Sequence, residues 1–470
     1  MKAIKFGTDG WRGVVSFDFT LPRVLLVAEA IRQYLLTKNL LNRPLIIAND
    51  TRFLAPEISA LVGNYLLDRG LDVKMIRGFT PTPVTAFAVL SNSACGAIML
   101  TASHNPYYYL GVKFIPYYGG PAEDEITEQI SNAILELSQA PFGVPEFSPV
   151  FKGDFIDVKE AYFNHVSTLV NGSAIKSLHA RMLYSPMYGC GQGFVTGFLK
   201  RYDVEVHRMH VGRDVLFGGI LPDPNPSNLK LLVPKLKELG LELGFATDGD
   251  ADRFGIVTKD GDCFGANHIL PLLAEFLISI KQKKGALVRT VVTSHLLDEV
   301  GKHFNVPVVE TPVGFKYVGK HLREGALIGG EESGGISIQG HVPEKDGILS
   351  ILLTLEMIAT YGESLPAIYK KLTSRFVPYS YERIDLNLKS NQRKEVMVKA
   401  RRFIETGSFL GERIEEVKTI DGLKVTFEDG SWVAFRESGT EEVLRVYFEA
   451  PTEQSFKRLK KQLRYFLQKC

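Results

Sequence analysis

The sequence has few cysteines, almost no net charge and no long apolar run. Its four cysteines, Cys95, Cys190, Cys263 and Cys470, lie far apart and match neither a zinc-ligand nor a disulfide spacing. This pattern favours a reducing compartment, in which Cys95 and Cys190 fill small core positions. Lys plus Arg (55) nearly balances Asp plus Glu (53), so the total charge gives no argument for nucleic acid or an anionic membrane as a partner.

No stretch reaches the length of a membrane-spanning helix, and the first residues, MKAIKFGTDGWRG, lack the apolar segment of a signal peptide. We therefore expect a soluble, cytoplasmic protein. At 470 residues the chain exceeds the size at which a single core keeps growing, which predicts two to four domains.

Short apolar runs alternate with amphipathic stretches along most of the chain. The run Leu45–Ala48 follows a helical pattern at Leu21–Lys38, and the run Cys95–Leu100 follows another at Pro83–Leu90. Such alternation predicts βαβ units around mainly parallel sheets. The proline-punctuated stretch Ala140–Gly153 resembles a linker, and the same rhythm restarts twice after it.

The pattern changes near Phe376. A strand-like run, Tyr381–Leu388, precedes a helical pattern, and three further strand-like runs precede a terminal amphipathic helix at Glu453–Leu467. Clustered strands with separate helices predict a smaller α+β domain. We therefore expect three α/β domains at residues 1–150, 151–258 and 259–374, and an α+β domain at 375–470.

A polar turn, Thr101-Ala102-Ser103-His104-Asn105-Pro106, follows the apolar run that ends at Leu100. In open α/β sheets, functional groups gather at the carboxyl ends of strands. Ser103 would stand at such a strand end with His104 beside it, although a serine hydroxyl needs an activating neighbour to act as a nucleophile. Taken alone, the hexapeptide also fits an ordinary turn.

Three carboxylates at alternate positions follow the apolar run that ends at Thr247, in the stretch Asp248-Gly249-Asp250-Ala251-Asp252-Arg253. Their crowding is unfavourable unless a cation neutralises it, and oxygen ligands select Mg²⁺ first, before Ca²⁺ or Mn²⁺. An EF-hand is excluded because Arg253 and Lys259 stand where it needs Gly and Glu. A solvated acidic turn is the alternative.

Two further stretches are rich in glycine and hydroxyl groups. In Gly329–Gly335 (GGEESGG), Glu331 and Ser333 suit sugar hydroxyls, although a simple glycine-rich turn is an alternative. In Arg436–Glu441 (RESGTE), the arginine, the hydroxyls and the backbone N–H groups suit an anion, although a β-turn with a surface arginine fits as well.

The order of these motifs, one in each predicted domain, resembles the α-D-phosphohexomutase family. TASHNP resembles its phosphoserine loop, DGDADR its metal loop, GEESGG its sugar loop and R-x-SGTE its phosphate loop. Gly7–Gly13 and Thr311–Lys316 also resemble family segments. The resemblance spans nearly the whole chain. It implies three related α/β domains with mainly parallel mixed sheets, plus a C-terminal TATA-binding-protein-like α+β domain, around a central cleft.

The resemblance also implies a reaction, the reversible transfer of a phosphoryl group between the 1- and 6-positions of a hexose phosphate, such as glucose 1-phosphate. Ser103 would carry the phosphoryl group, and a hexose 1,6-bisphosphate would be both intermediate and activator. One Mg²⁺ would be held by Asp248, Asp250, Asp252 and the phosphoserine oxygen of Ser103. Such a reaction depends on positioning and charge neutralisation.

The family pattern implies roles for the remaining candidates. Arg12 and Arg253 would add positive charge near the transferred group. Lys113 or His104 would be the general acid and base, and the family pattern favours Lys113. Glu331 and Ser333 would read the 3- and 4-hydroxyls, with Lys316 as a further phosphate or sugar contact. The second phosphate would be bound by Arg436, Ser438, Gly439 and Thr440.

The sequence departs from the family pattern at three places. Leu110 replaces the usual asparagine before Gly111, which bears on the position of Lys113. Glu437 and Glu442 replace prolines in the phosphate loop. The sugar loop reads GEESGG, whereas dual-specificity phosphomannomutase/phosphoglucomutase enzymes commonly show GEMSGH. This difference favours glucose, yet epimers at C2 share the hydroxyls that the loop would read.

Several alternatives share the motifs. A bifunctional phosphomannomutase/phosphoglucomutase or a phosphoglucosamine mutase would use the same mechanism. A non-catalytic sugar-phosphate-binding protein would not need the intact Ser103 and aspartates, and a magnesium-dependent phosphatase would let water intercept the phosphoserine. The expected partners are small hexose phosphates, with the protein a monomer or homodimer.

Overall fold

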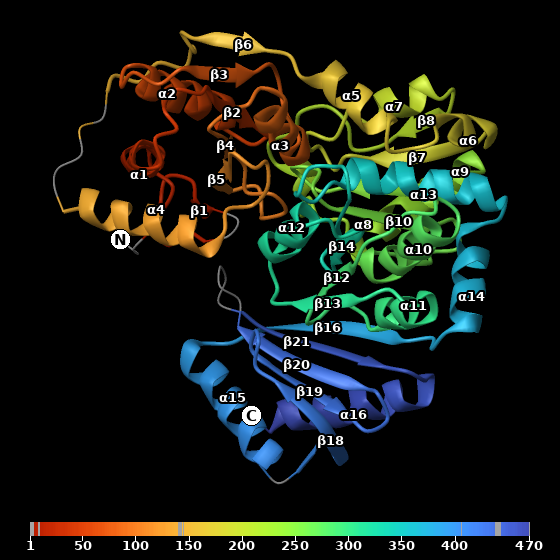
Figure 1. Cartoon of the computed structure of the whole chain (residues 1–470). Coiled ribbons are helices and arrows are strands. Elements are labelled where there is room, and N and C mark those ends of the chain that lie inside the picture. Colours follow the sequence, from red (N-terminus) through yellow and green to blue (C-terminus); the bar gives the residue numbers. More distant parts are fainter. Residues whose placement is uncertain are drawn as a thin grey trace.

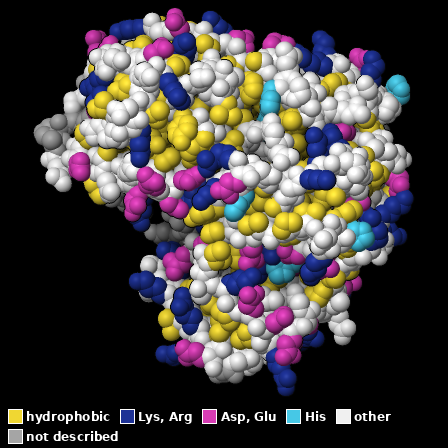
Figure 2. All heavy atoms as spheres, viewed as in Figure 1, with side chains coloured by type: hydrophobic (Ala, Val, Ile, Leu, Met, Phe, Trp, Pro, Cys, Tyr) yellow, Lys and Arg dark blue, Asp and Glu magenta, His cyan; other side chains and the backbone are white. Residues whose placement is uncertain are grey.

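The computed structural model describes residues 4–7, 10–139, 143, 145–405, 407–437 and 443–469. Figure 1 shows the chain running from an N-terminal α/β domain through two further α/β domains to a C-terminal domain, drawn in blue, at the lower end of the molecule. Figure 2 shows the surface hollowed between the N-terminal and C-terminal domains. The expected architecture of three α/β domains and one α+β domain is therefore confirmed.

The first domain is built on a six-stranded mixed sheet with strand order β1-β5-β4-β2-β3-β6. The strands β4, β2, β3 and β6 run parallel, β5 pairs antiparallel with β4, and β1 pairs antiparallel with β5 at the edge of the sheet. Its elements are β1 (Trp11–Val14), α1 (Leu21–Thr37), β2 (Leu45–Asn49), α2 (Ala55–Leu67), β3 (Val73–Ile76), α3 (Thr82–Ser91), β4 (Gly96–Leu100), β5 (Tyr109–Pro116), α4 (Asp124–Leu137) and β6 (Asp154–Ile156).

The central strand β2 is buried on both faces, as its apolar run predicts. Because alternate side chains point to opposite faces, Ile46 and Ala48 join one core cluster, while Leu45 and Ile47 join another. The strand β6 pairs with β3 although it lies beyond residue 150, so this sheet takes in three residues from after the linker.

The second domain has a five-stranded sheet with order β11-β10-β9-β7-β8, in which β9, β7 and β8 are parallel. Helix α9 ends at Gly240, whose positive φ of 63° suits a left-handed helix cap. The elements are α5 (Lys159–Ser167), α6 (Gly172–Ser177), β7 (Arg181–Ser185), α7 (Val195–Arg201), β8 (Glu205–Arg208), η1 (Phe217–Gly219), α8 (Pro226–Leu229), η2 (Lys230–Leu232), α9 (Val233–Leu239), β9 (Leu243–Thr247), β10 (Phe254–Thr258) and β11 (Cys263–Phe264).

The third domain has a four-stranded sheet with order β13-β12-β14-β15, parallel except for β15. The side chain of Asp346 caps α13 by accepting hydrogen bonds from the N–H groups of Ile348 and Leu349. The elements are α10 (Ala266–Ser279), β12 (Leu287–Thr290), α11 (Leu296–Phe304), β13 (Val308–Thr311), α12 (Phe315–Arg323), β14 (Ile328–Glu331), β15 (Gly335–Ile338), α13 (Gly347–Tyr361) and α14 (Leu365–Arg375).

The C-terminal domain has a sheet with order β16-β21-β20-β19-β18-β17, in which all pairs are antiparallel. Helices α15 and α16 pack on the same sheet face, where they share a core with its strands. The elements are β16 (Ser380–Asn387), α15 (Ser390–Glu405), β17 (Ser408–Phe409), β18 (Glu412–Lys418), β19 (Leu423–Phe427), β20 (Trp432–Glu437), β21 (Val443–Ala450) and α16 (Glu453–Gln468).

Packing ties the first three domains together more closely than the fourth. One core cluster includes side chains from α3, α5, α10 and α13, which belong to three different domains. The C-terminal domain contacts the third through a small cluster in which Val291 and Val292 pack against Trp432, Ala434 and Tyr447.

Within the described residues, no single helix has the length and apolarity to cross a membrane, and α13 and α14 reach that length only as a pair bent by 80°.

Candidate active site

Ser103 lies in the loop between β4 and β5, as expected, and is buried. Its φ of 50° is in the left-handed region, which is uncommon for a residue with a side chain. The Oγ atom donates a hydrogen bond to Asp248 Oδ2 (2.9 Å) and lies 3.3 Å from His104 Nδ1. The structure therefore places the serine of the first domain against the first carboxylate of the second.

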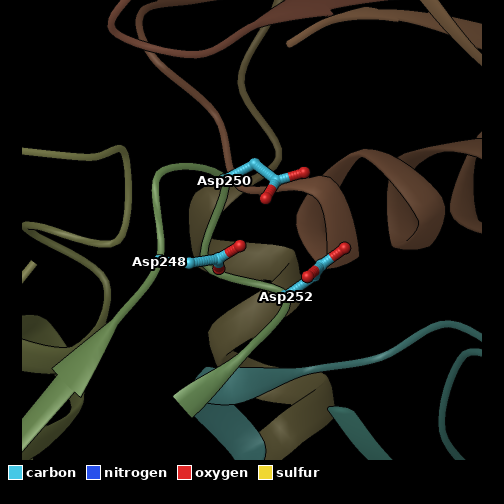
Figure 3. Close-up of side chains that lie close together, drawn as sticks. All are labelled: Asp248, Asp250 and Asp252. Carbon is cyan, nitrogen blue, oxygen red and sulfur yellow. The ribbon is translucent and has the colours of Figure 1, made fainter. Parts of the chain in front are cut away.

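The metal loop connects β9 to β10, and its three carboxylates point to the same side (Figure 3). One oxygen from each of Asp248, Asp250 and Asp252 lies within 4.8 Å of the others, and all three side chains are buried. Burial and the neighbouring carboxylates of Asp250 and Asp252 raise the pKa of Asp248 well above its ordinary value. Burial also acts to raise the pKa of Asp250, but the ammonium group of Lys113 outweighs it and lowers that pKa.

The carboxylates have oxygen atoms to spare for a cation. Asp250 Oδ1 and Asp252 Oδ1 are buried and have no hydrogen-bond partner among the residues that the structure describes. Buried acceptors of this kind are rare in native proteins unless an ion or a water molecule contacts them. Three hard oxygen donors of like charge fit Mg²⁺.

Lys113 projects from β5 into the same cluster. Its Nζ atom is 2.7 Å from Asp250 Oδ2 and 3.1 Å from Asp252 Oδ2. Leu110, where the sequence departs from the expected pattern, packs into the apolar core of the first domain, and Lys113 reaches the carboxylates in its presence. Burial and the nearby Arg253 and Arg12 cations lower the pKa of His104 well below its ordinary value, which favours the neutral imidazole.

The two expected arginines lie at the serine loop and at the metal loop. Arg12 on β1 donates a hydrogen bond from Nη1 to Asn105 Oδ1 (2.7 Å). The backbone N–H of Arg253 donates to Asp248 Oδ1 (3.0 Å), while its guanidinium is 3.9 Å from both Asp223 Oδ1 and Asp252 Oδ1. Both positive charges therefore stand beside the cluster.

The sugar loop forms the turn between β14 and β15. Glu331 closes β14 and accepts a hydrogen bond from the N–H of Gly314 (2.7 Å), which joins it to the segment that carries Lys316. Ser333 lies in the turn and is half-buried. Lys316 forms an ion pair with Asp124 at the start of α4, so the third domain contacts the first.

Arg436 lies on β20, where its Nε atom donates to Asp421 Oδ2 (2.7 Å). Across the strand pair, Arg436 is directly opposite Arg445 of β21. Burial raises the pKa of Glu332, although the cations of Arg383, Arg436 and Arg445 act in the opposite direction. The C-terminal domain therefore presents arginines toward the sugar loop.

The other expected phosphate ligands, Ser438, Gly439 and Thr440, lie outside the described residues.

The sequence reasoning missed several charged residues of this site. Arg52 follows β2 and donates to the carbonyl oxygen of Ser103 (2.6 Å), and only its place after a strand could have marked it. Lys345 Nζ is 3.4 Å from Asp252 Oδ2, and its stem fills the space that a side chain at Gly335 would need. Arg445 lies inside a strand and has no motif of its own.

A buried serine beside three carboxylates and a lysine, with arginines on the facing domain, is the arrangement of an enzyme that handles phosphate esters. Models of the phosphoglucomutase/phosphomannomutase family match all four parts: alpha/beta/alpha domain I at residues 3–141, domain II at 160–261, domain III at 265–376 and the C-terminal domain at 387–465.

Individual relatives match over nearly their full length. A "Probable phosphoglucosamine mutase" of Methanosphaera stadtmanae is 30% identical over 99% of both chains. A "Phosphoglucomutase/phosphomannomutase" of Thermococcus kodakarensis is 29% identical over 96% of this chain and 95% of its own. The crystal structure of a "putative phosphomannomutase" from Thermus thermophilus aligns over 99% of both chains, with 32% identity and a TM-score of 0.85.

The chain belongs to the α-D-phosphohexomutase family and has the four-domain architecture of its phosphoglucomutase/phosphomannomutase members. It is a phosphohexomutase, an isomerase that moves a phosphoryl group within a hexose phosphate. The name phosphoglucosamine mutase recurs among further relatives of similar identity.

Proposed function

We propose that the protein transfers a phosphoryl group reversibly between O1 and O6 of a hexosamine or hexose phosphate, with glucosamine phosphate as the first candidate and glucose phosphate as the second. The single observation that carries the mechanism is the contact between Ser103 Oγ and Asp248 Oδ2. It joins the hydroxyl that would be phosphorylated to the carboxylates that would neutralise the transferred charge.

The proposed reaction starts from phosphorylated Ser103. The sugar hydroxyl attacks the phosphorus atom, the P–Oγ bond breaks and the new P–O bond gives a hexose 1,6-bisphosphate. After the bisphosphate turns over in the cleft, its other phosphoryl group returns to Ser103, and the isomerised monophosphate leaves. Catalytic amounts of the bisphosphate would activate any enzyme that is not phosphorylated.

Asp248, Asp250 and Asp252 would hold one Mg²⁺, which neutralises charge on the transferred phosphoryl group when it is bound. Arg253 and Arg12 add fixed positive charge beside Ser103. In its neutral amine form, Lys113 would take the proton from the attacking sugar hydroxyl and return it to the leaving oxygen. His104 is the second candidate for this role, because its neutral ring lies 3.3 Å from Ser103 Oγ.

The second phosphate of the substrate would bind to the C-terminal domain. Arg436 and Arg445 stand on directly opposite residues and place two guanidinium groups on one face of the sheet, which suits the several oxygens of a phosphate. Ser438, Gly439 and Thr440 would add hydroxyl and backbone donors. The phosphate site of the C-terminal domain and the sugar loop, which would bind the 3- and 4-hydroxyls, can accept both orientations of the bisphosphate.

Two considerations favour an amino sugar over the glucose phosphate that the sugar loop alone suggests. Relatives named phosphoglucosamine mutase are prominent among the full-length matches. In addition, the sugar loop itself carries the acidic side chains of Glu331 and Glu332, and an ammonium group at C2 would find a partner there. A cytoplasmic location and a monomeric or homodimeric state stay predictions.

The proposal is tested by initial rates on glucosamine 1-phosphate, glucose 1-phosphate and mannose 1-phosphate, each with Mg²⁺ and a trace of the matching bisphosphate. We expect the highest kcat/KM on glucosamine 1-phosphate. A clear preference for glucose 1-phosphate would contradict the substrate assignment and leave the mechanism in place. Release of free phosphate at the rate of substrate loss would indicate a phosphatase, and no turnover on any substrate would indicate a binding protein.

A further inference from the structure

The side chain of Arg52 lies beneath the serine loop and is fully buried. Its guanidinium donates to four backbone carbonyl oxygens of that loop and the strand after it, those of Ser103 (2.6 Å), Asn105 (2.6 Å), Pro106 (2.9 Å) and, at the start of β5, Tyr109 (3.1 Å). All four acceptors are carbonyl oxygens of the protein itself, so Arg52 makes these hydrogen bonds without contacting a substrate.

An ion pair and two hydrogen bonds link Arg52 to the backbone N–H of Ser103 on the other side. Asp50 lies 3.3 Å from Arg52 Nε and accepts a hydrogen bond from Thr101 Oγ1 (2.6 Å). The Thr101 hydroxyl in turn accepts from the N–H of Ser103 (2.8 Å). Both the N–H and the carbonyl oxygen of Ser103 are therefore fixed by one buried network.

This network holds the serine in a costly conformation. A left-handed φ at a residue with a side chain costs on the order of 1 kcal/mol or more and persists only where its surroundings impose it. The carbonyl oxygen of Ser103 also lies close to Gly249, where a side-chain carbon would stand only 2.6 Å away. The carbonyl of Ser103 is thus packed closely between Arg52 and the metal loop.

The second domain holds Arg52 in place. The guanidinium of Arg52 lies over the ring of Phe217, with 4.9 Å from Cζ to the ring centroid. Arg213 donates hydrogen bonds to the carbonyl oxygens of Thr51 and Arg52 (both 3.1 Å). Arg52 therefore connects the serine loop of the first domain to a loop of the second domain.

We propose that Arg52 is a positioning residue for phosphoryl transfer: it fixes the direction of Ser103 Oγ toward the reacting hydroxyl and does not contribute to substrate binding. This inference rests on the proposed role of Ser103. A lysine cannot replace Arg52, because only the planar guanidinium offers five donors in a fixed fork that can reach four carbonyl oxygens at once.

The test measures phosphorylation of Ser103 in a single turnover with a hexose 1,6-bisphosphate, followed by intact-protein mass spectrometry, together with steady-state kcat and KM. For Arg52→Lys we expect kcat and the phosphorylation rate to fall about 100-fold, because a displacement of about 1 Å has an effect of that size. The KM should stay within about threefold, since no substrate contact is lost.

Arg32→Lys is the matched control. Arg32 is an arginine of the same domain that makes a bidentate contact with Glu29 within α1 and has no contact with the serine loop. It should leave both rates unchanged. Rates of Arg52→Lys within threefold of wild type would overturn the inference. If the wild type itself gains no phosphoryl group at Ser103, the proposed function fails instead, which keeps the two failures distinct.

A second pair of variants decides the question if Arg52→Lys does not fold. Thr101→Val removes the hydroxyl between Asp50 and Ser103, and Thr101→Ser keeps it. We expect phosphorylation of Ser103 to slow at least tenfold in Thr101→Val and to recover in Thr101→Ser. Equal rates in both variants would overturn the inference.

Discussion

Arg436 on β20 and Arg445 on β21 are direct partners across an antiparallel strand pair, so their side chains leave the sheet on the same face. Asp421 contacts Arg436 and also accepts a hydrogen bond from the N–H of Val313 in the third domain. Asp421 therefore connects the candidate phosphate site to the segment that precedes Lys316. The residues that would bind the phosphate and those that would bind the sugar are in this way linked by hydrogen bonds.

Replacing Arg445 should weaken substrate binding more than turnover. For Arg445→Gln we expect KM to rise roughly 10- to 100-fold, the equivalent of one or two charge-assisted hydrogen bonds. Arg402→Gln, on the exposed part of α15, is the control. An unchanged KM in Arg445→Gln would exclude this arginine from the phosphate site.

Ser103→Ala should abolish turnover while hexose phosphate binding survives. The hydroxyl is the only proposed carrier of the phosphoryl group, and its removal leaves the sugar and phosphate contacts of the other domains in place. Calorimetric titration with glucose 6-phosphate and glucosamine 6-phosphate measures the binding. Turnover at the wild-type rate in this variant would exclude a phosphoserine mechanism.

Removal of divalent metal by a chelator should stop turnover, and added Mg²⁺ should restore it. Mg²⁺ should also raise the unfolding temperature, because a ligand at about 100 times its Kd stabilises the folded state by about 3 kcal/mol. Asp250→Asn should lose most of this thermal response, whereas Asp223→Asn, outside the triad, should keep it. A response that survives in Asp250→Asn would place the metal elsewhere.

The roles of Lys113 and His104 can be separated by one variant of each residue. Lys113→Arg retains a cation beside Asp250 but cannot give up its proton near neutral pH, so kcat should fall about 10² to 10⁴-fold. His104→Gln should lower kcat by less than about tenfold, a smaller fall than in Lys113→Arg. The opposite order of effects would assign the proton transfer to His104, and full activity of Lys113→Arg would limit Lys113 to an electrostatic role.

Glu310 on β13 lies at the contact between the third and fourth domains, where it pairs with Arg289, Lys418 and Lys424. Burial acts to raise its pKa, but the cations of Arg289 and Lys424 outweigh burial and hold the pKa at about 2. The stabilisation from the ionised Glu310 should therefore be complete above the pKa that Glu310 has in the unfolded chain, about 4.5. It should be lost as the pH falls toward about 2.

Glu310→Gln should lower the free energy of unfolding at pH 7 by no more than about 2 kcal/mol, because the side chain is partly solvated. The difference from wild type should shrink between about pH 4.5 and pH 2. Thermal unfolding across this range measures it. Glu416→Gln is the control, because it removes only a solvent-exposed ion pair with Lys418. A difference that does not change with pH would exclude the titration of Glu310 as its cause.

The sequence alone was sufficient to predict the four-domain architecture, and it placed Ser103 and Asp248 in loops that follow apolar strands, where the structure has them. It did not predict β18, whose charged residues Glu412–Lys418 give no apolar alternation, or the short edge strand β6. Arg52 and Lys345 were missed for a different reason. Their partners, Ser103 and Asp252, are far away in the chain, so only the tertiary structure brings them together.

The strand β6 determines how the molecule can be divided. It covers the outer edge of β3 although it follows the linker, through the pairs Lys74–Asp154, Met75–Phe155 and Ile76–Ile156. A recombinant fragment that stops at residue 150 would leave the backbone groups of β3 exposed, and such an edge invites aggregation with other copies. Fragments of the first domain and chimeras with relatives should therefore extend through Ile156.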